Sequence, residues 1–194
     1  MFDCQASAAR ATVMETFPLA RASSLRPNPG GYARLERNTR PVDVGELDDG
    51  DRPWLRALVD REWGLPAVSI SGAHDPSELP GLVAYEGEDR LGALTYRIEH
   101  DTCEVVTINA LIEGRGVGAT LLTAARAIAD ERGLRLWLIT MNDNIRAIDF
   151  YQRQGMDLIA LHRNFVDVVR QYKPTVGDKT MNGIPLKHAL EFSY

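Results

Sequence analysis

The chain has 194 residues, of which 44% are hydrophobic and 25% charged, and its formal net charge is −5. This balance is typical of one soluble globular domain with extensions, and the acidic charge disfavours a nucleic-acid partner. The longest apolar runs are far shorter than the roughly 20 residues of a membrane-spanning helix, so no membrane partner is expected.

The first 30 residues differ in composition from the rest. They are rich in Ala, Arg and Ser, poor in acids, and lead into Pro-Asn-Pro-Gly-Gly. We predict a flexible leader over 1–30 and a single domain over 31–194. A transit peptide, which is also rich in Arg and Ser, and an upstream start ahead of Met14 remain alternatives.

The first elements of the domain are a strand and a helix. Residues 34–44 suit a strand, and a helix is expected over 52–63, with Pro53 near its start and Gly64 at its end. The helix has apolar residues near one face, namely Trp54, Leu55, Leu58, Val59 and Trp63. After a brief apolar run, residues 68–81 are expected to form a loop.

The second half predicts a regular alternation of strands and helices. Two strands over 82–100 turn at 87–89, and further strands are expected at 103–112, 134–140, 156–163 and near the C-terminus. Helices are expected over 117–132 and within 142–155. Antiparallel strands followed by β-α-β-α-β indicate an α/β fold, a mixed sheet with helices on both faces.

Three glycines, Gly114, Gly116 and Gly118, precede the helix at 117–132. This helix has one apolar face, made of Leu121, Leu122, Ala125, Ile128 and Ala129. Glycine is favoured where φ is positive or where something approaches bare backbone. The unpaired N–H groups and partial positive charge of a helix N-terminus suit a phosphate.

Two phosphate-binding motifs fit this segment poorly. A P-loop requires a lysine, and the segment has none. Gly114, Gly116 and Ala119 satisfy the dinucleotide fingerprint, and Asp143 follows the next strand. However, antiparallel strands precede the fingerprint, and only about 75 residues follow it, too few for a second nucleotide-binding half.

The segment Glu113-Gly114-Arg115-Gly116-Val117-Gly118 resembles the pyrophosphate loop of the GCN5-related N-acetyltransferases, Gln/Arg-x-x-Gly-x-Gly/Ala, with Glu113 in place of Gln or Arg. A second signature of that family, Asn-x-x-Ala-x-x-Phe/Leu-Tyr-x-x-x-Gly-Phe, is matched downstream. Its matching residues are Asn144, Ala147, Phe150, Tyr151 and Gly155, with Met156 in place of Phe. The resemblance implies a mostly antiparallel mixed sheet with a splayed acetyl-coenzyme A cleft.

This resemblance implies an acetyl-CoA-dependent N-acetyltransferase in which a primary amine attacks directly in a ternary complex. The backbone N–H groups of Arg115, Gly116, Val117, Gly118 and Ala119 would bind the pyrophosphate. The strand end at Ala110, Leu111 and Ile112 would pair with pantetheine. Asn144 is either a helix N-cap or a ligand of the pantetheine arm.

Two residues are expected to carry the chemistry. By resemblance Tyr151 is the general acid that protonates the departing thiolate, while the alternative is an aromatic packed beside Phe150. Glu104 is the best candidate for the base, directly or through a water, and the alternative is a solvated strand-end carboxylate. Asn109 could orient a water or the amine. A covalent acetyl-enzyme at Cys103 is a further alternative.

The cysteines and histidines give further expectations about partners and location. Cys4 and Cys103 show neither a disulfide framework nor metal-ligand spacing, and the four histidines are scattered, so a cytoplasmic protein without metal is expected. The acceptor is a small-molecule or peptide amine, defined by residues 52–80 and 163–190, and a homodimer is one assembly the sequence allows. The alternative function is a non-catalytic module that binds acetyl-CoA or CoA for regulation.

Overall fold

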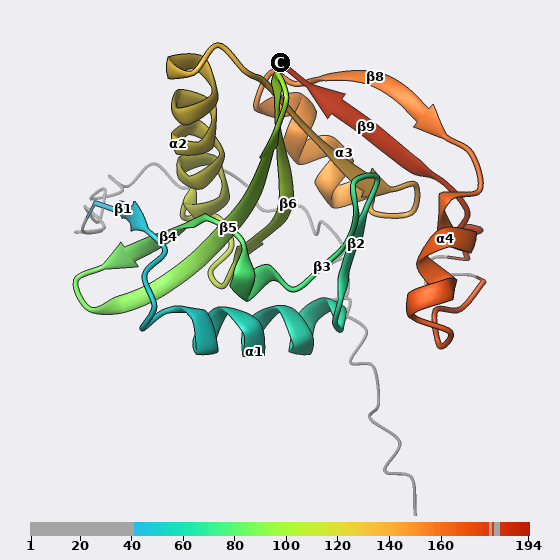
Figure 1. Ribbon diagram of the computed structural model, residues 1–194, viewed down its shortest axis with the longest axis horizontal. Coiled ribbons are helices and arrows are strands. Elements are labelled where there is room, and N and C mark those ends of the chain that lie inside the picture. Colours follow the sequence, from blue (N-terminus) through green and yellow to red (C-terminus); the bar gives the residue numbers. More distant parts are fainter. Residues whose placement is uncertain (1–40, 179, 181–182) are drawn as a thin grey trace, which may run out of the picture. The chain divides into compact units, whose positions relative to one another are not determined.

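The computed structural model describes residues 41–178, 180 and 183–194 (Figure 1). The predicted leader over 1–30, its boundary with the domain, and residues 34–40 of the predicted first strand lie outside these residues. Within the described chain, that first strand is β1, Asp43–Glu46.

The described strands include a seven-stranded sheet in the order β1-β4-β5-β6-β7-β9-β8. The strands after β1 are β4 Gly81–Glu86, β5 Asp89–Glu99, β6 Thr102–Ala110, β7 Arg135–Met141, β8 Asp157–His162 and β9 Ala189–Ser193. β6 and β7 pair in parallel, and each other neighbouring pair is antiparallel. The predicted mixed, mostly antiparallel sheet is therefore confirmed.

Helices cover both faces of this sheet, as predicted (Figure 1). They are α1 Arg52–Trp63, α2 Val117–Glu131, α3 Ile145–Arg153 and α4 Phe165–Tyr172. α2 and α3 share one core, in which Leu121 and Tyr151 pack with Leu94 of β5. α1 covers the opposite face, where Leu55 packs with Val83. α4 packs on this second face, near Ile139 and Ala189.

The ends of α1 follow its sequence signals. Pro53 lies in its first turn, and Gly64 takes a φ of 71° after the last residue. Leu55 is buried, but Trp63 is 48% exposed, although both were expected on the apolar face. At this end of α1, Nζ of Lys173 donates to the carbonyl oxygens of Trp63 and Gly64.

The expected loop over 68–81 contains regular secondary structure, so that prediction was wrong in part. Ala67–Ser69 and Gly72–His74 pair as a hairpin, β2 and β3, and a 3-10 turn follows at Pro76–Glu78. Strands of three residues are too short to show an alternating pattern in the sequence. β2 contacts β6, and its Val68 packs against the cluster around Phe165 of α4.

The parallel pair β6–β7 is short, and its end creates the splay that the family resemblance implied. Thr102–Val105 pair with Arg135–Leu138, whereas β6 continues beside β5 to Ala110 and β7 continues beside β9 to Met141. Val106 is an extra residue on β6, because Thr95 pairs with Thr107 and Tyr96 with Val105. A bulge of this kind bends a strand. The two halves of the sheet therefore meet at one end and diverge toward the other (Figure 1).

Candidate active site

The three glycines after β6 serve two different physical needs. Gly114 and Gly116 have φ values of 72° and 76°, which residues with side chains rarely adopt. Gly118 lies inside α2, and a Cβ atom there would lie 3.3 Å from Cζ of Phe150. The first two glycines therefore shape the turn, while the third allows α3 to approach the first turn of α2.

The N-terminus of α2 has no side-chain cap. Gly116 is the N-cap residue, and the first helical hydrogen bond runs from Thr120 N to Gly116 O at 2.9 Å. The N–H groups of Val117, Gly118 and Ala119 therefore have no acceptor within the helix. These donors and the helix dipole form an anion-binding end. Leu111 and Ile112, which precede this end, are 43% and 41% exposed.

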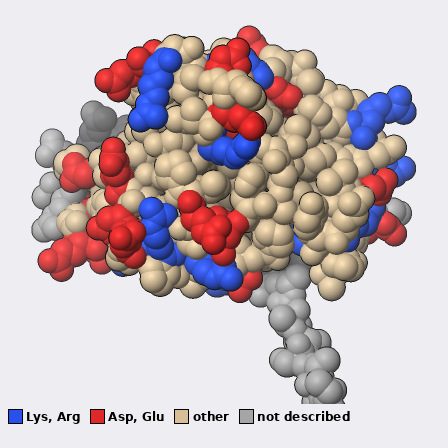
Figure 2. All heavy atoms as spheres, in the orientation of Figure 1, with Lys and Arg blue, Asp and Glu red and all other residues tan. Residues whose placement is uncertain are grey.

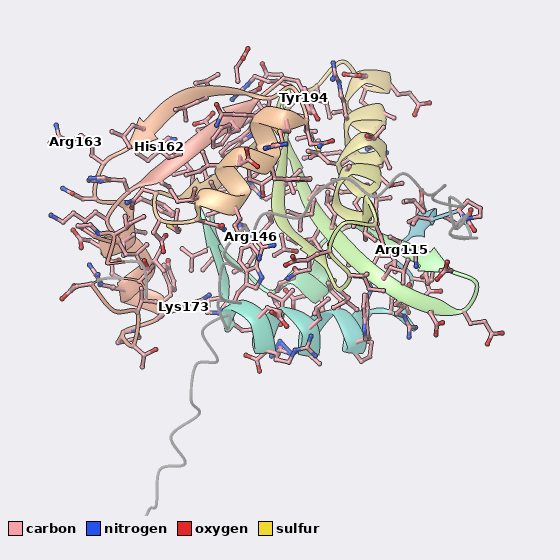
Figure 3. All side chains as sticks on the ribbon, turned by 180° about the vertical axis from the view of Figure 1, so that it is seen from behind. Arg115, Arg146, His162, Arg163, Lys173 and Tyr194 are labelled. Atoms are coloured by element: carbon pink, nitrogen blue, oxygen red, sulfur yellow. The ribbon has the colours of Figure 1, made fainter. Side chains whose placement is uncertain are left out.

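Arg115 anchors the glycine loop to the neighbouring hairpin. Its Nη1 and Nη2 atoms each lie 2.8 Å from a carboxylate oxygen of Glu86 at the end of β4. Because the guanidinium charge is balanced within the protein, the contribution of Arg115 to an anion comes chiefly from its backbone. Figure 3 shows Arg115 beside β4 and β5. The sequence pattern did not indicate Glu86 as its partner.

Glu113, which departs from the family pattern, has a cationic partner on another element. Its Oε1 lies 2.6 Å from Nη2 of Arg146, in the first turn of α3. Figure 3 shows Arg146 on α3. Both side chains are about two-thirds exposed, at 67% and 64%. Sequence reasoning missed Arg146, although an acid in a loop that binds phosphate is a signal to look for a nearby cation.

Asn144 and Tyr151 lie at the start and in the middle of α3. The Oδ1 atom of Asn144 accepts a hydrogen bond from Ala147 N at 3.2 Å, so the residue forms the predicted N-cap. This contact leaves the amide N–H₂ group able to donate elsewhere. Tyr151 is 5% exposed, with ring centroids 5.3 Å from Phe150 and 5.6 Å from Phe192. Burial raises the pKa of its phenol.

Glu104 lies on the opposite face of the sheet from Tyr151, because Cys103 and Val105 on either side of it belong to the core beneath α2. It is 2% exposed, and neither carboxylate oxygen has a hydrogen-bond partner. The alternative of a solvated strand-end carboxylate is therefore wrong. Buried polar atoms are almost always hydrogen-bonded, so this carboxylate calls for a functional explanation.

The surroundings of Glu104 come from three other strands. Its register neighbours are Arg97 on β5 and Trp137 on β7, and the indole Nε1 of Trp137 is also buried without a partner. Desolvation lowers the pKa of His74 on β3, and the charge of Glu104 opposes that shift. Sequence reasoning missed Trp137 and His74, since a tryptophan within an apolar strand is typical of a core.

Asn109 lies on the same face, farther along β6 and beyond the point where the strands part. It is 9% exposed, and its Oδ1 atom is buried without a partner. Between Glu104 and Asn109, Thr107 and Thr95 share a hydrogen bond of 2.7 Å. The carboxylate of Glu104 and the Oδ1 atom of Asn109, which both lack partners, therefore lie at separate positions along β6.

Cys103 is a core residue. It is 1% exposed, and burial raises the pKa of its thiol to about 11. The nucleophilic form of cysteine is the thiolate, which this environment suppresses at neutral pH. Among residues 41–178, 180 and 183–194, no cluster of His, Cys, Asp or Glu could hold a metal ion. No helix in that part of the chain could cross a membrane.

Comparisons with known proteins agree with this geometry. Residues 29–156 match the family model described as Acetyltransferase (GNAT) family. YxbD, an uncharacterized protein of Bacillus subtilis (strain 168), is 36% identical over 139 residues, covering 70% of this chain and 87% of YxbD. YdhI, also uncharacterized and from the same organism, is 35% identical over 136 residues, covering 69% of this chain and 85% of YdhI.

Solved structures share the fold at low sequence identity. The IAA acetyltransferase from Bacillus cereus ATCC 14579 superimposes with a TM-score of 0.61 at 18% identity, covering 79% of this chain and 98% of that one. A GNAT family acetyltransferase from Elizabethkingia anophelis with acetyl-CoA bound gives 0.57 at 16%, covering 78% and 96%. A Bacillus subtilis acetyltransferase in complex with CoA gives 0.55 at 18%, covering 78% and 95%.

Proposed function

Because this chain belongs to the GNAT acetyltransferase family, we propose that it transfers the acetyl group of acetyl-CoA to a primary amine by direct attack in a ternary complex. One observation carries the proposal: the uncapped N-terminus of α2 follows the end of β6 that has parted from β7. Solved structures with the same fold hold CoA or acetyl-CoA.

The cofactor arm would use the backbone on both sides of the glycine loop. The N–H groups of Val117, Gly118 and Ala119 donate to the pyrophosphate, where the dipole of α2 favours negative charge. The edge of β6 from Ala110 into Leu111 and Ile112 pairs with the pantetheine amides as an added strand would. The amide N–H₂ group of Asn144 is a further donor to this arm.

The two candidate catalytic groups lie on opposite faces of the sheet. An alkyl ammonium has a pKa near 10 and must lose a proton before its nitrogen can attack. Glu104, on the face of α1, accepts that proton directly or through a water. The neutral amine then forms a C–N bond with the acetyl carbonyl carbon. Direct attack is supported by the buried, protonated Cys103 thiol, which is a poor nucleophile.

Tyr151 completes the reaction from the face covered by α2 and α3. When the C–S bond breaks, the phenol donates its proton to the departing thiolate. The surplus proton of the attacking nitrogen is lost at this stage and restores the phenol, so the products are the neutral amide and free CoA. Because burial raises its pKa, Tyr151 stays protonated throughout the physiological range. The pH profile therefore has no limb from this residue at neutral pH.

The proposal is tested by amine-dependent thiol release from acetyl-CoA, with Tyr151→Phe beside the wild type. Loss of a general acid is expected to lower kcat about a hundredfold with little change in the affinity for CoA. Tyr194→Phe, at the C-terminal tyrosine whose ring lies against Arg126 of α2, is the matched control and keeps full activity. Unchanged turnover by Tyr151→Phe would contradict its role.

The same assay distinguishes the proposed acetyltransferase from the alternative function. Tight binding of CoA without thiol release from any amine would support the non-catalytic CoA-binding module, for which Glu113 in the phosphate loop is the motivating observation. The amine acceptor, the cytoplasmic location and a homodimer stay predictions.

A further inference from the structure

Two unpartnered polar groups lie side by side where the sheet begins to open. Glu104 and Trp137 are register partners on β6 and β7, one residue before the last pair of that ladder. Glu104 is 2% exposed and Trp137 is 9% exposed. Both oxygens of the carboxylate and the Nε1–H group of the indole lack hydrogen-bond partners. Paired strands lie about 4.8 Å apart, so the two side chains are close neighbours on the same face of the sheet.

Two neighbouring side chains that could donate to Glu104 already have other partners. Arg97, the register neighbour of Glu104 on β5, forms an ion pair with Glu99. The Nε2 atom of His74 lies 2.9 Å from Oγ of Ser71, within the β2–β3 hairpin. Glu104 therefore requires a hydrogen-bond donor, and Trp137 an acceptor, that these side chains do not supply.

We propose that Glu104 and Trp137 recognise the acceptor, and that the acceptor is an amine whose neighbouring carbon carries a carbonyl oxygen. An α-amino group offers this combination: its nitrogen donates to the Glu104 carboxylate, and the adjacent carbonyl oxygen accepts from Trp137 Nε1. A lysine ε-amine has no oxygen at that position. This inference rests on the acetyltransferase function proposed above.

Such an acceptor is either an amino-acid derivative or a peptide N-terminus, because both carry an α-amine beside a carbonyl group. Glycinamide represents the first source and triglycine amide the second, while propylamine is an amine of similar size to glycinamide that lacks the oxygen. Rates are compared at equal concentrations of neutral amine, since an α-amine has a pKa near 8 and an alkyl amine one near 10.

The experiment measures kcat/KM for the three amines with the full chain and acetyl-CoA. The wild type is expected to prefer the α-amines, and the better of the two identifies the source. Trp137→Phe keeps the aromatic bulk but removes the N–H donor. It should lower kcat/KM for the preferred α-amine about tenfold and leave propylamine unchanged. Propylamine is the internal control, since it lacks the carbonyl oxygen that Trp137 would recognise.

Two results would overturn the inference while the function stands. One is a wild-type kcat/KM for propylamine equal to the values for both α-amines, a comparison that needs no variant. The other is an equal loss for all three amines in Trp137→Phe, which would indicate a purely structural tryptophan. Failure of the proposed function gives a different result: acetyl-CoA binds, yet no amine releases thiol, and the acceptor assignment then falls with it.

Discussion

At the scale of single residues, the acidic Glu113 of the glycine loop forms an ion pair with Arg146 of α3. Glu113 would repel a pyrophosphate, and Arg146 lies 2.6 Å from its carboxylate, so the pair adds no net charge to the loop. A pyrophosphate bound at α2 offers Arg146 a second anionic partner. The guanidinium therefore offsets the departure of this loop from the family pattern.

Arg146→Ala is expected to weaken CoA binding, because Glu113 then faces the pyrophosphate without its partner. Exposed ion pairs contribute roughly 0.2 to 1 kcal/mol, so the expected change in Kd is about 1.4- to fivefold, and smaller at high salt. Calorimetric titration with CoA at low and high salt measures it. Arg153→Ala, which breaks an exposed pair with Asp149 on the same helix, is the control and should leave Kd unchanged.

Gly116 is the residue whose backbone shape matters most for the loop. Its φ of 76° disfavours any side chain, and an alanine there costs about 1 to 2 kcal/mol or forces the loop to change shape. Gly116→Ala should therefore lower both Tm and the affinity for CoA.

Gly133→Ala is the comparison, since Gly133 has a φ of 66° just beyond the other end of α2. It should lower Tm to a similar extent and leave CoA binding intact. Equal losses of affinity in the two variants would show that backbone strain, and not the loop at Gly116, controls binding.

At the scale of elements, α3 is positioned by its cap and by its contact with α2. The helix has nine residues, too few to be stable without tertiary packing. Asn144 caps its first turn, and Phe150 lies against Gly118 of α2. Tyr151 is thereby fixed on the helix that borders the glycine loop.

Two substitutions at Asn144 separate its possible roles. Asn144→Ala removes the cap and should destabilise the protein by about 1 kcal/mol. Asn144→Asp keeps a capping oxygen but removes the amide donor, so Tm should stay near the wild-type value. If Asn144 also binds pantetheine, the Asp variant binds CoA more weakly. Wild-type affinity in the Asp variant would limit the residue to capping. Thermal melts and CoA titrations read out the two effects.

At the scale of the whole molecule, the formal net charge is modest. Figure 2 shows acidic and basic side chains interspersed on the face seen there, in keeping with a net charge of only −5. The pH dependence of stability is expected to come from individual groups with shifted pKa values, such as the half-buried His74.

His74 predicts how stability changes with pH. Desolvation lowers its pKa in the folded protein below the ordinary value of 6.5, so the unfolded chain takes up the proton more readily. The contribution to stability is complete above 6.5 and is lost as pH falls from there toward the folded pKa. Tm should decline over that window, and His74→Asn should decline less.

His100→Asn is the control for this measurement. His100 is exposed in a turn with a φ of 53°, a conformation that asparagine tolerates, so its replacement should leave the pH profile unchanged. A wild-type profile that is flat across the window would contradict the assignment to His74.

Features that depend on neighbouring residues were predictable from the sequence. Pro53 and Gly64 mark the ends of α1, the glycines after β6 mark the turn into α2, and Asn144 marks the start of α3. Each is a local effect of backbone torsion or of a side chain near its own helix end. The order of strands and helices follows from apolar periodicity, and with the two motifs it was enough to identify the family.

Which distant side chains come into contact depends on the tertiary structure. The pairs Glu86–Arg115, Glu113–Arg146 and Glu104–Trp137 each join residues about 30 positions apart on different elements. The brief parallel pairing of β6 with β7, ended by the bulge at Val106, decides where the sheet opens. Such contacts depend on the register and packing of whole elements, whereas a sequence pattern reports only the periodicity within each one.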